Sequence, residues 1–329
     1  MRTWLCRIAI VGTAVASMFM VAAPAHAIFP GQDRVAFVRY DSNDATIHTI
    51  DVDGSNLKTP VKALGAMLPR FMSAALSPDG TKILYSRVVN DTNVDLYVKT
   101  IGGSIDRITH TGGIWEYSAS WSPNGRRIAF SETDNTSYGR LAVSRADGTN
   151  YVPVFTSPID FVWYPSWSPD GTRIAFSSSD GTDREIYLAP PLAGVKVAPI
   201  TNNAVDDLAG DWSANGGRIA LVREPAAAPR PAFGTRAGIR WHAPRGIAPL
   251  GDVFTIRTDG SHPFQVTDDT KTFGRVIYAT KDSFLVSRLA HVSIDLYSVS
   301  TGGGGYTRLT RTAETYNIVD LAKFVLGIA

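Results

Sequence analysis

The stretch WSPDGTRIAF, residues 167 to 176, joins a tryptophan, a Ser-Pro-Asp-Gly turn and a short apolar run. Related stretches stand at residues 76 to 85, 121 to 130 and 212 to 221, with the sequences LSPDGTKILY, WSPNGRRIAF and WSANGGRIAL. Proline fixes φ early in such a turn, the Asp or Asn side chain hydrogen-bonds locally, and glycine closes the turn into a tight reversal. The stretch is therefore predicted to be the strand, turn and strand of an internal repeat.

The spacing of the repeat follows from the last residue of each stretch and of two related segments near the chain ends. These residues are Phe37, Tyr85, Phe130, Phe176, Leu221 and Val286, at intervals of 48, 45, 46, 45 and 65 residues. A second element, an Asp-Gly or Gly-Gly pair between extended segments, recurs in the later half of the period and favours a hairpin, because glycine adopts positive φ. Each period thus predicts four short strands, which is typical of a β-propeller blade.

Large side chains stand directly before the repeated turn. A twisted sheet cannot bury both of its own faces, so neighbouring blades must pack against one another. We expect this inter-blade packing from the following residues: Leu76, Trp121, Trp167, Trp212 and Tyr278.

The repeated stretches, together with the downstream segments DLYVKT, EIYLAP and DLYSVS, resemble the WD40-like PD40 repeats of the TolB-type β-propellers. The resemblance covers essentially all of the chain after residue 27. It implies an all-β fold, a six-bladed β-propeller of four-stranded antiparallel blades. Periplasmic TolB proteins also carry an α/β domain before the propeller, whereas the repeats here begin close to Ile28, so the resemblance does not extend to the partners of that system.

Residues 1 to 27 are predicted to be a secretory signal peptide, followed by a single propeller domain over residues 28 to 329. A basic start is followed by an apolar stretch and the small-residue site Ala25-His26-Ala27. The alternative is an uncleaved anchor, but the apolar stretch is shorter than the ~18 residues usual for a span. We therefore expect a secreted, periplasmic or cell-envelope protein with no membrane span after cleavage. Cys6, the one cysteine, lies in the leader, so no disulfide is expected.

The charge balance bears on the class of partner. The chain has 32 Lys plus Arg and 30 Asp plus Glu, and the leader contains two of the Arg and none of the acids, which leaves 30 against 30. Without a net positive field, nucleic acid is not an expected partner. We expect a monomer that binds an envelope or extracellular protein, peptide or glycan.

The chain ends predict how the ring closes. The segments DRVAFVRY and TIHTIDV match the second and third strands of a blade, so the first blade lacks its innermost strand. The C-terminal segment around residues 316 to 324 stands where a further inner strand is due. We expect this segment to complete the first blade, which would remove exposed sheet edges.

Residues 224 to 250 form an insertion in the fifth blade that is rich in Pro, Ala and Arg and contains Trp241. One interpretation is a plain surface loop, as its length and proline content favour. The other is a docking arm, because Arg and Trp often anchor interfaces.

The segments that lead into the inner strands open at one end of the central channel, where loops on a rigid ring often bind ligands. The predicted ligand or partner site comprises Trp115, Glu116, Tyr117, Trp163, Tyr164, Asp206, Asp207 and Arg275, with Phe161, Glu314 and Tyr316 nearby and Trp241 in the insertion. The alternative is that these side chains only pack the channel mouth.

The sequence favours a binding module over an enzyme. It contains no Gly-x-Ser-x-Gly elbow, and its histidines show no HExxH-like spacing. The alternative is a carbohydrate-active enzyme or a metal-dependent polysaccharide lyase that uses channel carboxylates (Glu116, Asp206, Asp207) or histidines (His48, His110, His242, His262, His291). No cofactor or metal site is expected, although a divalent cation is compatible with this composition. The Asp51-x-Asp53-Gly54 segment is interpreted as a hairpin turn, because it lacks the closing Glu of a calcium loop.

Overall fold

The computed structural model describes residues 18–20, 34–40, 45–51, 55–61, 73–90, 92–134, 138–157, 161–179, 183–224, 251–268, 272–280, 282–290 and 293–308. All regular elements among these residues are β-strands, which confirms the all-β prediction. No helix in the described part of the chain is long and apolar enough to span a bilayer.

The strands fall into six consecutive units, which we number 1 to 6. Unit 1 contains β1 (Met18–Met20), β2 (Arg34–Tyr40), β3 (Ala45–Asp51) and β4 (Lys58–Val61). Unit 2 contains β5 (Ala74–Leu76), β6 (Lys82–Asn90), β7 (Asn93–Thr100) and β8 (Ile105–Arg107). Unit 3 contains β9 (Trp115–Trp121), β10 (Arg127–Thr133), β11 (Gly139–Arg145) and β12 (Val152–Thr156).

The second half of the ring repeats this order. Unit 4 contains β13 (Trp163–Trp167), β14 (Ile174–Ser179) and β15 (Arg184–Ala189). Unit 5 contains β16 (Asp207–Trp212), β17 (Arg218–Arg223), β18 (Asp252–Arg257) and β19 (Phe264–Gln265). Unit 6 contains β20 (Thr272–Thr280), β21 (Ser283–Ala290), β22 (Ser293–Ser300) and β23 (Tyr306–Arg308).

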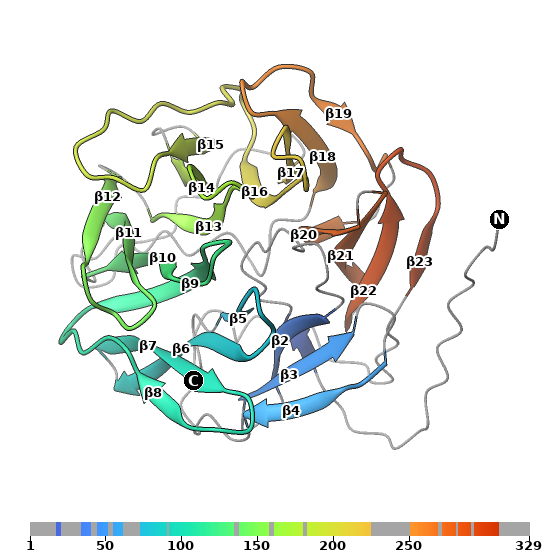
Figure 1. Cartoon of the computed structure of the whole chain (residues 1–329). Helices are drawn as coiled ribbons and strands as arrows, with labels where there is room; N and C mark the ends of the chain where they lie inside the picture. The colour runs from blue at the N-terminus through green and yellow to red at the C-terminus, as the bar shows by residue number, and fades with distance from the viewer. Residues whose placement is uncertain are drawn as a thin grey trace, which may run out of the picture.

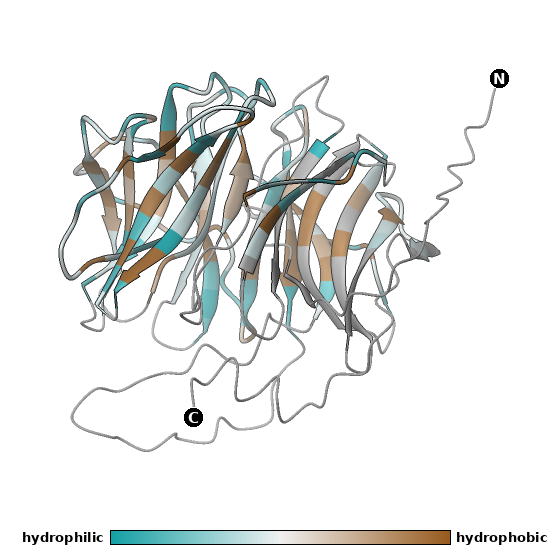
Figure 2. Ribbon diagram, turned by 90° about the horizontal axis from the view of Figure 1, so that it is seen from below, coloured by the Kyte–Doolittle hydropathy of each residue, from teal (hydrophilic) through white to brown (hydrophobic). Residues whose placement is uncertain are grey.

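The units are arranged around a common axis, with strands such as β9, β13 and β16 innermost and strands such as β8, β12 and β19 at the rim (Figure 1). Neighbouring strands within a unit are antiparallel. Units 2 and 3 join into one eight-stranded sheet through a parallel bridge between Val94 of β7 and Trp115 of β9. In the side view, apolar residues occupy the middle of many strands, whereas hydrophilic residues gather towards the ends and turns (Figure 2).

The tryptophan that precedes each repeated turn packs between units, as predicted. Trp121, Trp167 and Trp212 are buried, and Leu76 is buried at the same position of unit 2. The Trp121 indole Nε1 donates to the Ala75 carbonyl oxygen at 3.1 Å, so this ring also ties unit 3 to unit 2. The side chain of Tyr278 lies outside the described residues.

The repeated turn forms as its sequence predicts. In the turn after Leu76, Asp79 accepts hydrogen bonds from the Ser77 hydroxyl at 2.6 Å and from the Thr81 amide at 3.0 Å. Gly80 has a φ of +70°, which a residue without Cβ adopts at no steric cost. The turn then reverses the chain from β5 into β6.

The expected ring closure involves residues 316 to 324, which lie outside the described part of the chain. The edge of β2 that the C-terminal segment was expected to cover is paired with β1, in which Phe19 lies opposite Arg39. Closure by the C-terminal strand therefore stays a prediction.

Candidate functional site

Inner strands β9, β13 and β16 each end at the tryptophan before a repeated turn, so they begin at the opposite end of the channel, which we call the channel mouth. The first two strands bring together an aromatic cluster, defined as Trp115, Tyr117, Phe161, Trp163 and Tyr164. The Trp163 ring lies 5.4 Å from Tyr117, 5.7 Å from Phe161 and 6.0 Å from Tyr164, measured between ring centroids. Phe161 and Tyr164 are only half-buried, so part of the aromatic surface of the cluster is exposed.

The backbone under this cluster is held in an uncommon conformation. Ser118 has a φ of +50° and Tyr164 a φ of +56°, and each stands three residues before the tryptophan that ends its strand. A bulky residue with positive φ is an outlier, and such strain concentrates at ligand-binding sites. The strand register also shifts between Trp163 and Ser166, which aims the Tyr164 side chain differently from a regular strand.

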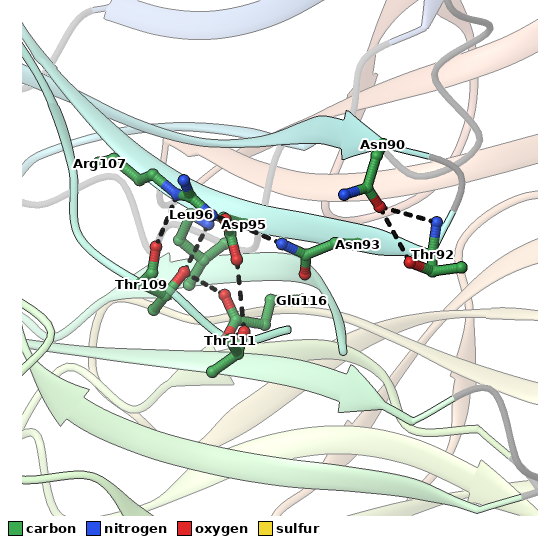
Figure 3. Close-up of polar contacts among 9 residues, drawn as sticks. All are labelled: Asn90, Thr92, Asn93, Asp95, Leu96, Arg107, Thr109, Thr111 and Glu116. Atoms are coloured by element: carbon green, nitrogen blue, oxygen red, sulfur yellow. Dashed lines mark hydrogen bonds and ion pairs between the residues drawn. The ribbon is translucent and has the colours of Figure 1, made fainter. Parts of the chain in front are cut away.

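Glu116 lies between two members of the aromatic cluster but points into a polar network between units 2 and 3 (Figure 3). Its carboxyl group is buried and bonded to the hydroxyls of Thr109 and, at 2.8 Å, Thr111. Burial raises the pKa of Glu116 to about 7; the threonine bonds lower it, and the neighbouring Asp95 and Glu132 raise it further.

The channel-mouth carboxylates of unit 5 belong to a separate network. Arg223 binds both carboxylate oxygens of Asp207 at 2.7 Å, and Asn203 donates to the same group at 2.8 Å. Asp206 accepts from the Arg184 amide at 2.8 Å and pairs with the guanidinium of the same residue at 3.5 Å. Both carboxylates are buried, so these contacts organise the start of β16.

Glu185, on β15, is a second buried carboxyl group with a raised pKa, and it belongs to the same polar network as Asp207. It accepts a hydrogen bond from the Asn203 amide at 2.8 Å. Burial raises the pKa of Glu185 to about 7; bonds from Thr201 and Asn203 lower it, and Asp207 and Asp183 raise it.

The structure thus brings the predicted aromatic residues together, whereas the polar contacts of Asp206 and Asp207 are with Arg184, Asn203 and Arg223. The side chain of Arg275 and the whole of Trp241, Glu314, Tyr316 and the 225–250 segment lie outside the described residues. Asp51 ends β3, its amide donates to the Ser55 carbonyl at 2.9 Å and its carboxylate pairs with Arg34 at 2.7 Å, while residues 52 to 54 of the predicted hairpin turn lie outside the described residues.

The histidines of the alternative enzyme hypothesis do not converge where the structure describes them. His48 is buried and bonded to Thr46 and Thr59 at 2.8 and 3.1 Å, while His110 and His262 are exposed. His242 and His291 lie outside the described residues. Within the described ranges, no three His, Cys, Asp or Glu side chains are grouped to hold a metal ion.

Sequence reasoning missed the partners of Glu116, namely Asp95, Thr109, Thr111 and Glu132. A signal was present in the repeat, because the acid at the start of the DLYV-type strand and the threonine at the end of the RIT-type strand recur together. In unit 2 the Leu96 amide donates to the Thr109 hydroxyl at 2.8 Å, and in unit 5 the Val253 amide donates to Thr267 at 2.9 Å. Aligning the repeats at these two positions predicts that the acid at the start of one strand and the threonine at the end of the next lie close together.

Comparison with known proteins finds a match in structure only. No family model and no curated protein sequence matches the chain. TolB from Acinetobacter baumannii is 20% identical with a TM-score of 0.62, over 84% of this chain and 63% of that one. The chain therefore spans less than two thirds of that protein's length. A putative TolB from Agrobacterium tumefaciens is 16% identical with a TM-score of 0.62, over 82% of this chain and 90% of that one.

A solved structure with a different activity is similar in the same way. An oligogalacturonate lyase in complex with manganese is 10% identical with a TM-score of 0.60, over 94% of this chain and 82% of that one. Identities this low carry the fold and leave the activity open. The antiparallel units of three or four strands, their circular arrangement and these neighbours together show that the chain has the fold of a TolB-like β-propeller.

Proposed function

We propose that the protein is a binding module of the cell envelope or extracellular space that holds a protein, peptide or glycan partner at the channel mouth. The observation that carries the proposal is the half-buried aromatic cluster, in which Tyr164 is held at a φ of +56°. Aromatic side chains supply a large contact area at low conformational cost, and they stack on both apolar side chains and sugar rings. The resemblance to periplasmic TolB propellers supports the location.

The contacts of the carboxylates favour binding over hydrolysis. A pair of catalytic carboxyl groups needs one ionised group free to face the substrate. Asp207 is instead enclosed by Arg223 and Asn203, and Asp206 by Arg184. These contacts suit a rigid ring that presents a fixed aromatic surface.

Affinity capture on the immobilised protein tests the proposal. The partner is first retained from envelope and culture-fluid extracts, then purified and titrated against the protein. The test variant combines Phe161→Ala with Tyr164→Asn, because both rings are half-buried and asparagine tolerates positive φ. We expect its affinity to fall at least tenfold.

The matched control is Phe264→Ala, which removes an exposed ring from the rim strand β19. It should retain the partner as the wild type does. Equal affinity of all three proteins would overturn the site, and chemical conversion of the partner by the wild type would replace the binding module with an enzyme.

A further inference from the structure

A buried carboxyl group at the junction of units 2 and 3 has different neighbours from its counterpart in unit 5. Glu116 and Asp207 each stand five residues before the tryptophan that ends their strand. The residue opposite Asp207 in the strand register is Arg223, whose guanidinium binds it at 2.7 Å. The residue opposite Glu116 is Glu132. Glu116 thus faces an acid where the equivalent carboxylate has a cation.

The hydrogen-bond geometry accommodates a proton on Glu116. The Thr111 hydroxyl oxygen lies 2.8 Å from Glu116 Oε1 and 3.3 Å from Asp95 Oδ1 (Figure 3). A hydroxyl has one hydrogen and cannot satisfy two carboxylates at once. With an ionised Glu116 the Thr111 hydroxyl donates to the nearer carboxylate, whereas a neutral Glu116 would donate its own O–H to Thr111 and leave Thr111 to donate to Asp95. The Thr109 hydroxyl, which accepts from the Leu96 amide, donates to the other oxygen of Glu116.

Several charged groups lie on the elements around Glu116. They are Asp95 on β7, Arg107 on β8, Glu132 and Asp134 at the end of β10, Arg140 on β11 and the exposed His110 between β8 and β9. Arg107 pairs with Asp95, and Arg140 pairs with Glu132 at 2.7 Å and with Asp134 at 3.7 Å. Tyr151 also donates to Glu132, at 2.5 Å. An ionised Glu116 would therefore add a negative charge beside two carboxylates whose guanidinium partners are already engaged.

The same residue is coupled to the aromatic cluster through the backbone. Trp115 forms the parallel bridge with Val94 that joins units 2 and 3, and the Val94 amide donates to the Ile114 carbonyl at 3.1 Å. Val94, Trp115 and Tyr117 pack together with Trp163. A charge that appears at Glu116 therefore acts on the short segment that positions the cluster.

We propose that Glu116 is a proton-controlled latch of this junction, and thereby sets the pH dependence of binding at the channel mouth. The neutral carboxyl completes the threonine network and holds Trp115 against Trp163. The ionised carboxylate repels Asp95 and Glu132, loosens the β7–β9 bridge and displaces the cluster. Partner binding, which rests on the proposed function, is then stronger at mildly acidic than at mildly alkaline pH.

Fluorine NMR of the full chain labelled with 5-fluorotryptophan tests the latch without any ligand. The resonances are assigned with Trp115→Phe and Trp163→Phe and followed from pH 5 to pH 9. We expect both to titrate in the wild type with a midpoint near neutral pH, and to stay at their acidic positions in Glu116→Gln. Glutamine keeps one donor and one acceptor for the two threonines. Resonances that do not move, or a titration that persists in Glu116→Gln, would overturn the proposal.

Three further variants keep the result specific. Glu185→Gln removes another buried carboxyl away from the cluster and should leave the titration of Trp115 unchanged, as should His110→Gln. Glu116→Asp retains a titrating group at a different reach and should move the midpoint, which gives a second readout if the glutamine variant does not fold. A midpoint that follows His110 instead would also overturn the latch.

Affinity capture at pH 6 and pH 8 separates the two proposals. If the fluorine titration follows Glu116 but no partner is retained at either pH, the binding module fails and the latch stands. If a partner is retained equally at both pH values by wild type and Glu116→Gln, the control of binding by the latch is wrong while the proposed function stands.

Discussion

Gly148 shows how single residues make neighbouring units fit. It closes the Asp-Gly turn between β11 and β12 with a φ of +83°, and an added Cβ would overlap the carbonyl oxygen of Ile108 in unit 2. Gly102, in the corresponding turn of unit 2, has a φ of +78° but nothing near a Cβ position. The two glycines share their backbone conformation and differ in the space around them.

We expect Gly148→Ala to destabilise the fold more than Gly102→Ala. The control should cost about 1 to 2 kcal/mol for the left-handed conformation, and Gly148→Ala should cost about 1 to 3 kcal/mol more because the methyl group is overpacked. Urea unfolding of both variants measures the difference. Equal decreases in the free energy of unfolding would show that the turn at Gly148 and the neighbouring unit 2 are not in close contact.

At the scale of the strand pair, the repeated tryptophans differ in one bond. Trp167 and Trp212 are both buried, and each is covered by a guanidinium, Arg127 at 4.7 Å and Arg173 at 5.1 Å from the ring centroid. The Trp212 Nε1 donates to the Ser166 carbonyl at 3.0 Å, whereas the Trp167 Nε1 has no described hydrogen-bond partner.

Trp212→Phe should therefore lower the free energy of unfolding by about 1 kcal/mol more than Trp167→Phe. Both variants lose similar ring contacts, but only the first leaves a buried carbonyl without its donor. Thermal melts of the two proteins, matched in concentration, make the comparison. A larger loss in Trp167→Phe would contradict this account of how units are tied together.

The ladder across β16 and β17 carries a buried ion pair between Asp207 and Arg223. Asp207 is fully buried, while its partner Arg223 is 22% exposed. We expect Arg223→Met to cost about 3 to 5 kcal/mol, because it leaves a buried charge unpaired. Arg34→Met, which breaks the more exposed pair with Asp51, should cost about 1 kcal/mol or less. Adding Asp207→Asn to Arg223→Met should recover part of the loss in urea unfolding.

For the whole molecule, buried carboxyls set the pH of maximum stability. Burial raises the pKa of Glu116 and Glu185 to about 7, so their stabilisation is complete below the unfolded value near 4.5 and is lost as pH rises to about 7. Hydrogen bonds from Ser168 and Thr172 lower the pKa of Asp170, so its stabilisation is lost as pH falls below 3.8. The wild type should therefore be most stable at mildly acidic pH, above the range in which Asp170 loses its stabilisation and below the range in which Glu116 and Glu185 lose theirs.

The double variant Glu116→Gln and Glu185→Gln should shift this maximum towards neutral pH. Glu116 alone should account for a difference on the order of 1 to 3 kcal/mol between pH 5 and pH 8. Melting temperatures of both proteins across this range provide the measurement. Parallel curves for wild type and variant would mean that neither carboxyl changes its pKa on folding.

Most of the fold could be predicted from the repeated stretch, because turns and alternating strands depend on neighbours in the sequence. The Ser-Pro-Asp-Gly turn, the buried Trp121 and Trp212 and the aromatic residues around Trp163 all lie where the period places them. The polar networks could not be predicted in the same way. Asp207 and Glu116 stand at the same position of the repeat, and only the opposite strand shows that one faces Arg223 and the other Glu132.

The sequence by itself determined the repeat, the all-β propeller and the inner-strand aromatics, since each follows from local turn chemistry and from the need of a sheet to bury both faces. Only the tertiary structure decided which carboxyl groups meet a cation and which meet an acid. Those contacts form between different strands and units, and the sequence of one repeat does not specify which side chains meet there. Coulomb energies and desolvation depend on such distances, so the charge state of Glu116 is a property of the assembled ring.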